Sequence, residues 1–246
     1  MTELRVIPLE GIPEVDEGDD LAALLAESAE RAGGLVDGDV LVVAQKAVSK
    51  AEGRVVALED VEPSPRARVL AGEHDARHVE AILRESVRIV RTRGSLVIAE
   101  TRHGFVCASA GVDRSNAPRP DLVVLLPLDP DASAERLRRD LNDRAGVRVA
   151  VVVSDSFGRP WRHGTTDVAI GCAGLAPLRD LRGERDAAGY ELRTTTIATA
   201  DEIAAAAELV MGKAAGIPGA IVRGLDVAGE GRATDLVMPA ERDLFR

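Results

Sequence analysis

The stretch Val147–Asp167 reads VRVAVVVSDSFGRPWRHGTTD, and the rest of the chain is organised around it. Its first half is a run of β-branched residues up to Val153, which predicts a strand buried on both faces. We expect this strand to end at Ser154, because the glycines and the proline that follow do not extend a strand easily. Asp155 and its flanking serines would then lie in a loop at the tip of a rigid core element.

The composition bounds the class of protein. The chain of 246 residues, 46% of them hydrophobic, can bury a sizeable core. We expect no signal peptide and no membrane segment, since no apolar run approaches the ~20 residues that a span needs. A net charge of -10 argues against a nucleic-acid partner. Cys107 and Cys172 have no metal-like spacing, so we expect reduced thiols and a cytoplasmic protein.

Short strands and amphipathic helices are interleaved along the chain, and this mixture predicts an α+β fold with mixed β-sheets in two lobes. We expect strands at 4–9, 40–44, 54–58, 122–126, 192–198 and 220–223, with an antiparallel meander at 87–90, 96–100 and 105–108. We expect helices at 18–32, 63–86 (in two pieces), 129–146 and 199–211. Thr199–Glu202 has the pattern of a capping box for the last helix, and 232–246 has no clear period.

Lysine is rare in this chain: only Lys46, Lys50 and Lys213 occur among the 31 basic residues. A GC-rich genome explains the arginine bias, so a retained lysine suggests a position that needs a compact, flexible charge. Two of the lysines follow the 40–44 strand, where a solvated loop is the alternative interpretation. His74 and His78 stand four residues apart without a third ligand, and we interpret them as surface residues rather than a zinc site.

No P-loop, GxGxxG, GxSxG or zinc signature is present. What remains is a set of hard oxygen ligands after predicted strands, Asp113, Asp155 and Ser156, which suit Mg²⁺ or Mn²⁺. For Asp113 and the nearby Asn116, hydrogen bonds to their own turn are the alternative. Four cations are candidates to balance phosphate charge: Lys50, Arg159, Arg162 and Lys213. The residues alone thus indicate a metal-dependent enzyme acting on phosphorylated substrates.

Several long blocks resemble the coenzyme F420:L-glutamate ligases (the CofE family) and the ligase half of the fused actinobacterial enzyme FbiB. The blocks include GIPEV, VVAQKAVSKAEGR, ASAGVDRSNAP, VVVSDSFGRPWRHGTTDVAIGCAGL, TIATADEIAAAAELVMGK and the closing DLF. The resemblance covers essentially the whole chain and implies a single ligase domain over 1–246, with no C-terminal nitroreductase-like domain. It also implies a CofE-like fold and an intertwined homodimer.

The resemblance implies GTP-dependent addition of L-glutamate to coenzyme F420-0, then of γ-linked glutamates to F420-1. An acyl phosphate would be the intermediate, and GDP and phosphate would be released. The implied cofactors are Mg²⁺ or Mn²⁺, as one or two ions, with K⁺ as an option. The alternatives are another metal-dependent amide ligase or phosphoryl-transfer enzyme, and a non-catalytic GTP-binding regulator with the same fold. GDP release that depends on both F420-0 and glutamate would separate these.

The resemblance also implies roles for individual residues. Asp113 and Asp155 would be catalytic and would bind metal together with Ser156, which stands where many relatives have threonine. The implied nucleotide contacts are Ile12, Pro13, Glu14, Val15, Gln45, Lys50, Asn116, Met211, Gly212 and Lys213. Gln45 stands where relatives often have serine or threonine. Lys213 stands where some relatives have a glutamine proposed to reach a second metal, and because its ammonium has no lone pair we assign it to phosphate binding.

The substrate residues are less sharply defined by the sequence. Arg159, Arg162 and His163 are candidates to hold the phosphodiester of the precursor or the carboxylates of glutamate, with Trp161 near the deazaflavin ring. The alternative is that Trp161 packs its own loop and the arginines pair with local acids. No residue stands out as a general base.

Overall fold

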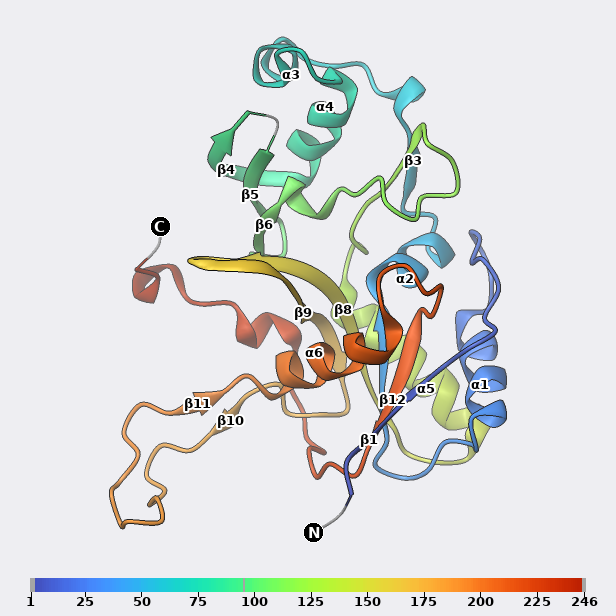
Figure 1. Ribbon diagram of the computed structural model, residues 1–246, viewed down its shortest axis with the longest axis vertical. Helices are drawn as coiled ribbons and strands as arrows, with labels where there is room; N and C mark the ends of the chain where they lie inside the picture. The colour runs from blue at the N-terminus through green and yellow to red at the C-terminus, as the bar shows by residue number, and fades with distance from the viewer. Residues whose placement is uncertain (1–2, 95, 245–246) are drawn as a thin grey trace.

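The computed structural model describes residues 3–94 and 96–244; Phe245 of the closing DLF block lies outside this range. A five-stranded sheet lies at the centre, in the order β1-β12-β2-β8-β9 (Figure 1). Its strands are β1 (Arg5–Pro8), β12 (Gly219–Arg223), β2 (Val40–Ala44), β8 (Ala150–Arg159) and β9 (Arg162–Ala173). β2 and β8 are parallel, and the other neighbouring pairs are antiparallel.

Helices cover both faces of this sheet, as Figure 1 shows. Val151 and Val153 pack in one hydrophobic cluster with α1 (Leu21–Arg31) and α5 (Pro130–Ala145). Val152 points to the other face, into the cluster of α6 (Thr199–Met211). Successive residues of a strand point to opposite faces, so a strand covered on both sides is apolar throughout. The prediction of a doubly buried strand is confirmed for 150–153.

The prediction that this strand ends at Ser154 is wrong. β8 continues to Arg159 and pairs with β9 in a long hairpin, where Ser156 lies opposite Asp167. The register shifts between Val153 and Ser154, as at a β-bulge, and a bulge re-aims side chains while the ladder continues. The polar side chains are tolerated because the serines bond to Asp167 across the hairpin. Ser154–Ser156 therefore lie within a sheet and not in a loop.

A second group of elements is inserted between β2 and α5 and forms the upper part of Figure 1. It contains the predicted meander, β4 (Ser86–Arg93), β5 (Leu96–Thr101) and β6 (Val106–Ala108), and the pair β3 (Val55–Ala57) and β7 (Leu122–Val124). Its helices are α3 (Pro65–Ala71), with Pro65 in the first turn, and α4 (Ala76–Glu85). The meander is confirmed, as is the helix in two pieces, and with them the mixed α+β class.

One helix was not predicted. α2 (Gln45–Ala51) follows β2 without a break, and its N-cap residue Ala44 makes no side-chain hydrogen bond. A helix of seven residues without a capping side chain gives no start signal in the sequence. Packing of Ala47 and Val48 in the core holds it instead. The polar residues after the 40–44 strand therefore lie on a helix, not in a solvated loop.

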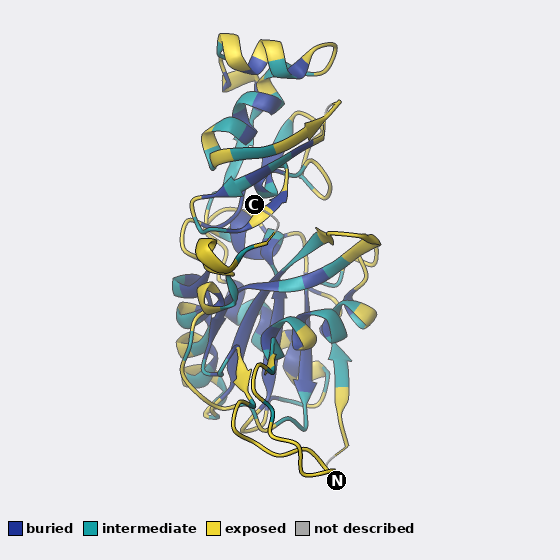
Figure 2. Ribbon diagram, turned by 90° about the vertical axis from the view of Figure 1, so that its left-hand side faces the viewer, coloured by how far each residue is buried: buried dark blue, intermediate teal, exposed yellow. Residues whose placement is uncertain are grey.

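The C-terminal third departs from prediction in two places. The strand expected at 192–198 is only β11 (Thr196–Ile197), which pairs with β10 (Arg179–Asp180). These two strands form the base of an exposed arm, residues 179–197 (Figure 2). The capping box at Thr199–Glu202 is wrong: Ala198 is the N-cap, and Asp201 accepts a hydrogen bond from the Ala169 backbone N–H at 2.9 Å. Its carboxylate therefore ties α6 to β9 rather than capping the helix.

Smaller elements and the thiols complete the description. Short 3-10 helices lie at Leu58–Asp60, Ser109–Gly111, Ala233–Leu236 and Ala240–Arg242. Cys107 and Cys172 are free and buried, and burial raises the pKa of each thiol to about 12. In the described part of the chain, no helix combines the length and the apolar character needed to cross a bilayer.

Candidate active site

A cavity of about 730 Å³ opens at the carboxyl end of β2, beside Ser154–Ser156 of the parallel strand β8. Ligands in open sheets of this kind bind beyond the carboxyl ends of parallel strands. Its walls come from five parts of the chain: residues 12–15, the β2–α2 junction, the 116–118 loop, the β8–β9 hairpin and 208–218. Segments far apart in sequence therefore meet in one cavity of a size suited to a small-molecule ligand.

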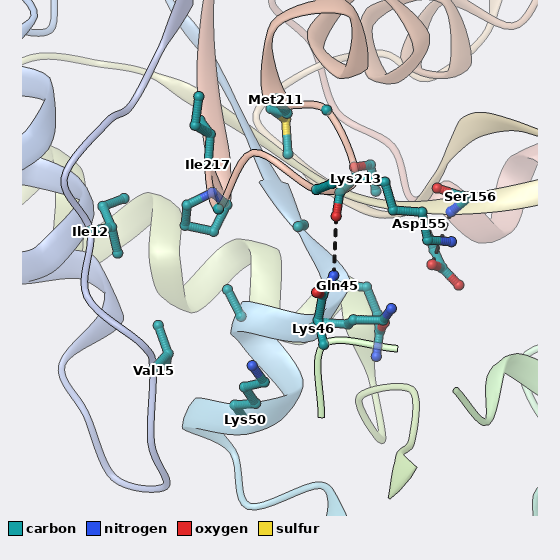
Figure 3. A pocket seen from close by; sticks show the side chains of 18 of the residues that line it. Ile12, Val15, Gln45, Lys46, Lys50, Asp155, Ser156, Met211, Lys213 and Ile217 are labelled. Atoms are coloured by element: carbon teal, nitrogen blue, oxygen red, sulfur yellow. Dashed lines mark hydrogen bonds between the residues drawn. The ribbon is translucent and has the colours of Figure 1, made fainter. Parts of the chain in front are cut away.

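The two sides of this cavity differ in character (Figure 3). Ile12, Val15 and Ile217 lie on one side and offer apolar surface. Asp155 and Ser156 lie on the other side, near Lys213. An apolar wall suits a planar ring, whereas cations and hard oxygens suit phosphates and their counter-ions. A ligand with one apolar and one highly charged end matches this polarity.

All of the residues predicted to contact a nucleotide line this cavity. They are Ile12, Pro13, Glu14, Val15, Gln45, Lys50, Asn116, Met211, Gly212 and Lys213. Asn116 also joins two walls of the cavity, because its Nδ2 donates to the Lys213 carbonyl at 3.3 Å. The fold thus brings together residues from widely separated segments.

Lys50 and Gln45 reach the cavity from α2 and have different polar partners. Lys50 is 6% exposed, and its Nζ forms an ion pair with the Glu14 carboxylate. Gln45 is buried, and its Nε2 donates to Ser49 Oγ at 2.7 Å and to the Leu125 carbonyl at 2.9 Å. Its amide donors are therefore engaged by the protein, which leaves its oxygen as the group for a ligand.

Asp113 does not line the cavity but is joined to it through Lys46, which does. Its carboxylate accepts from Lys46 Nζ at 2.6 Å and from the Ser115 N–H and hydroxyl at 2.8 and 2.7 Å. Burial opposes ionisation of Asp113, but the bonds from Lys46 and Ser115 outweigh it and lower the pKa of the carboxyl group. Lys46 was not assigned from sequence, although it is one of only three lysines and directly follows a buried strand.

Asp155 and Ser156 both line the cavity. Burial raises the pKa of Asp155 to about 7, and the nearby carboxylates of Asp167 and Asp113 act in the same direction. The backbone N–H of Ser156 and the ammonium of Lys46 oppose this shift. Asp113 and Asp155 are thus close enough to affect each other's charge. A cation placed among these carboxylates would relieve their repulsion.

Two acids of the cavity were given no role from sequence, Asp167, which closes the stretch 147–167, and Glu208. Asp167 lies on β9 and is 5% exposed. Burial raises the pKa of Glu208, as does the Asp167 carboxylate. Asp167 could have been found only from the hairpin register, which places it opposite Ser156, eleven positions earlier in the chain.

The four predicted substrate residues do not reach the cavity. Arg159, Trp161, Arg162 and His163 lie at the turn of the β8–β9 hairpin, and all four are exposed. Trp161 is 82% exposed and has a left-handed backbone, with φ of 55°. Among the described residues neither arginine forms an ion pair, so pairing with local acids is not seen either.

The donor set fits a divalent ion that is shared with a ligand. Asp155 and Ser156 present adjacent hard oxygens at the cavity wall, surrounded by further carboxylates. Within 3–94 and 96–244, no three His, Cys, Asp or Glu side chains converge into a complete metal site. Mg²⁺ commonly takes one or two carboxylates and completes its shell with waters and substrate phosphates. The residues present match that pattern rather than a closed cage.

The α+β fold and the polar cavity at the strand ends are features of an enzyme of small-molecule metabolism, and sequence comparison identifies its class. The F420-0:Gamma-glutamyl ligase family model matches residues 11–224. The chain therefore belongs to the F420-0:gamma-glutamyl ligase family and is a ligase.

Curated relatives support this assignment over nearly the whole chain. The coenzyme F420:L-glutamate ligase of Methanothermobacter thermautotrophicus is 46% identical over 250 residues, covering 99% of both chains. The enzyme of the same name from Methanopyrus kandleri is 49% identical over 251 residues, covering 99% of this chain and 98% of its own. The one from Archaeoglobus fulgidus is 43% identical over 246 residues, covering 99% and 96%. The resemblance seen in the sequence blocks is confirmed.

Proposed function

We propose that this chain adds L-glutamate to coenzyme F420-0 and then γ-linked glutamates to F420-1, using GTP. One observation carries the proposal: a single cavity gathers the residues that the family resemblance assigns to GTP beside Asp155 and Ser156. The names of the relatives, coenzyme F420:L-glutamate ligase, support the acceptor and the amino acid.

In this proposal the apolar side of the cavity, with Ile12 and Val15, holds the guanine ring. Lys46 and Lys213 line the charged side and balance the phosphates. Asp155 and Ser156 would hold Mg²⁺ or Mn²⁺, with Asp113 contributing from the adjoining loop. When bound, such an ion screens phosphate charge and the charge that develops during transfer. A second divalent ion and K⁺ remain part of the same proposal.

The chemistry follows from the poor reactivity of a carboxylate. An oxygen of the acceptor carboxylate attacks the γ-phosphorus of GTP, and the bond to GDP breaks. The amine of glutamate then attacks the acyl carbon, the bond to phosphate breaks, and the amine proton passes to solvent. The lysines stabilise both leaving groups, GDP and phosphate. The cavity walls hold the two reactants in contact, which supplies much of the remaining rate acceleration.

The test is turnover by the purified protein with F420-0, GTP, glutamate and Mn²⁺ or Mg²⁺, followed by mass spectrometry. We expect products heavier by one and then more glutamyl units, and GDP release that requires both F420-0 and glutamate. Replacing GTP by ATP is the control for the nucleotide. Nucleotide binding without any glutamylated product would contradict the proposal and favour a regulator.

The proposed assembly is a homodimer with two lobes in each chain. The exposed arm between β10 and β11 supports it, because most residues of the arm pack on little of their own chain (Figure 2). Light scattering should give twice the chain mass of 26.0 kDa, and a particle of single chain mass would refute it.

Lys50→Ala should weaken GTP binding by about thirtyfold or more, because truncating a buried charged partner typically costs 2–5 kcal/mol and the lower value corresponds to this factor. The fold should persist, since the partner Glu14 is largely exposed and can be solvated. Calorimetric titration of GTP measures the change.

Arg66→Ala is the control, because Arg66 is exposed on α3. Arg54 would not serve, since it pairs with Glu85 and donates to the Leu126 carbonyl. Unchanged affinity in Lys50→Ala would refute the role.

A further inference from the structure

Asp167 holds two serine hydroxyls of the neighbouring strand, one on each carboxylate oxygen. Its Oδ1 accepts from Ser156 Oγ at 2.6 Å, and its Oδ2 accepts from Ser154 Oγ at 2.9 Å. Asp167 and Ser156 are directly opposite in the β8–β9 register, so the backbone ladder fixes this contact. Both residues also line the cavity.

This arrangement decides what Ser156 can offer to a ligand. A hydroxyl has one proton and two lone pairs, whereas a carboxylate only accepts hydrogen bonds. Ser156 therefore gives its single proton to Asp167 and can present only lone pairs to the cavity. Lone pairs are what a divalent cation requires, and a proton pointing at the ion would repel it.

Asp167 is a buried carboxylate, and both of its hydrogen bonds across the hairpin come from neutral hydroxyls. Its side chain is 5% exposed, and among the described residues it pairs with no cation. Asp155 and Glu208 line the same cavity, and so do Lys46, Lys50 and Lys213. Burying a carboxylate beside other acids destabilises a protein unless a cation or strong donors compensate. The hydroxyls of Ser154 and Ser156 supply donors, and a cation bound in the cavity beside Ser156 would compensate the burial further.

We propose that Asp167 is a positioning residue for the divalent ion of the ligase reaction, acting through the hydroxyl of Ser156. The inference rests on the proposed function of the cavity. Outer partners of this kind orient metal ligands, and losing one typically costs about 10–100-fold in metal affinity. Asp167 contributes in two ways, by aligning the Ser156 oxygen and by adding negative charge near the ion.

A double-mutant cycle on Mn²⁺ affinity separates these two contributions. Free Mn²⁺ is measured by electron paramagnetic resonance at a fixed GDP concentration, for the wild type, Asp167→Ala, Ser156→Ala and the double variant. We expect Asp167→Ala to weaken Mn²⁺ binding tenfold or more in the wild-type background and threefold or less in the Ser156→Ala background. Asp167→Asn keeps the shape if the alanine variant does not fold. Asp180→Asn, on the exposed arm, is the matched control and should bind Mn²⁺ as the wild type does.

The outcomes distinguish this inference from the function on which it rests. If Asp155→Asn loses Mn²⁺ while Asp167→Ala retains it, the role of Asp167 is refuted and the cavity's metal site stands. Equal effects of Asp167→Ala in both backgrounds would show that it does not act through Ser156, which also overturns the inference. If neither Asp155→Asn nor Ser156→Ala affects Mn²⁺ binding, the proposed metal site fails and the role of Asp167 with it.

Discussion

Asp155→Asn should lower the glutamylation rate at least a thousandfold and yet make the metal-free protein more stable at pH 8. The loss of rate follows because Asn keeps the shape but removes the charge that attracts the ion; about 4 kcal/mol of transition-state stabilisation corresponds to this factor. Mass spectrometry of the product measures the rate. Turnover near the wild-type value would contradict the assignment of Asp155.

The gain in stability follows from the raised pKa of Asp155, about 7 in the folded protein against 3.8 for a solvated aspartate. Above pH 7 the folded state carries an ionised carboxylate that burial disfavours, and the unfolded state does not bear this cost. As the pH falls from 7 to 3.8, the folded protein binds the proton first and the penalty disappears. The contribution of Asp155 to the free energy of unfolding is therefore fully present below pH 3.8 and is lost as the pH rises through 7.

Asn escapes this penalty because it does not ionise. We expect Asp155→Asn to exceed the wild type by roughly 2 kcal/mol at pH 8, less than the full shift implies, because water reaches the side chain from the cavity. The advantage should vanish near pH 4. Urea unfolding in the presence of a chelator measures both values. Saturating Mn²⁺ should stabilise the wild type and not the variant. A variant less stable than the wild type at pH 8 would contradict the electrostatic account.

Gly171→Ala should destabilise the fold by about 3 kcal/mol, at the upper end of the usual cost of overpacking. A Cβ at this position of β9 would lie 2.2 Å from the Pro130 carbonyl oxygen and 2.4 Å from its carbon. These are backbone atoms at the start of α5, so no side-chain rotation relieves the clash. The midpoint of thermal unfolding should fall by about 10 °C for a chain of this size.

Gly158→Ala is the matched control in the same hairpin. A Cβ at Gly158 meets nothing within 4 Å, and its backbone is not left-handed. We expect its unfolding free energy to stay within about 0.5 kcal/mol of the wild type, as for most surface substitutions. Equal stability of the two variants would show that α5 does not pack on β9 as closely as described.

The sequence predicts the regular elements well where the pattern is strong. The β-branched run up to Val153 and the meander from 86 to 108 have clear periodicity and turn residues, and both are confirmed. The extension of β8 beyond Ser154 could not be predicted, because its stability comes from pairing with β9 and from Asp167 across the hairpin. α2 was missed for a similar reason, since core packing rather than a capping residue holds it.

The residues of the site fall into the same two groups, those that the sequence predicts and those that only the tertiary fold brings together. The family resemblance indicated which residues would meet, and those assigned to the nucleotide do line one cavity. Contacts made only by the tertiary fold were invisible: the pairing of Lys46 with Asp113, and the two hydroxyls held by Asp167. The reverse failure occurs at Trp161, whose position beside the motif suggested a role in the cavity, whereas a hairpin carries it away.

The most direct test of the central claim is the crystal structure of the protein grown with GDP and Mn²⁺, with anomalous scattering used to locate the metal. We predict a Mn²⁺ peak beside Asp155 and Ser156, with the guanine ring against Ile12 and Val15. A nucleotide bound outside this cavity, or a Mn²⁺ peak away from both Asp155 and Ser156, would contradict the account.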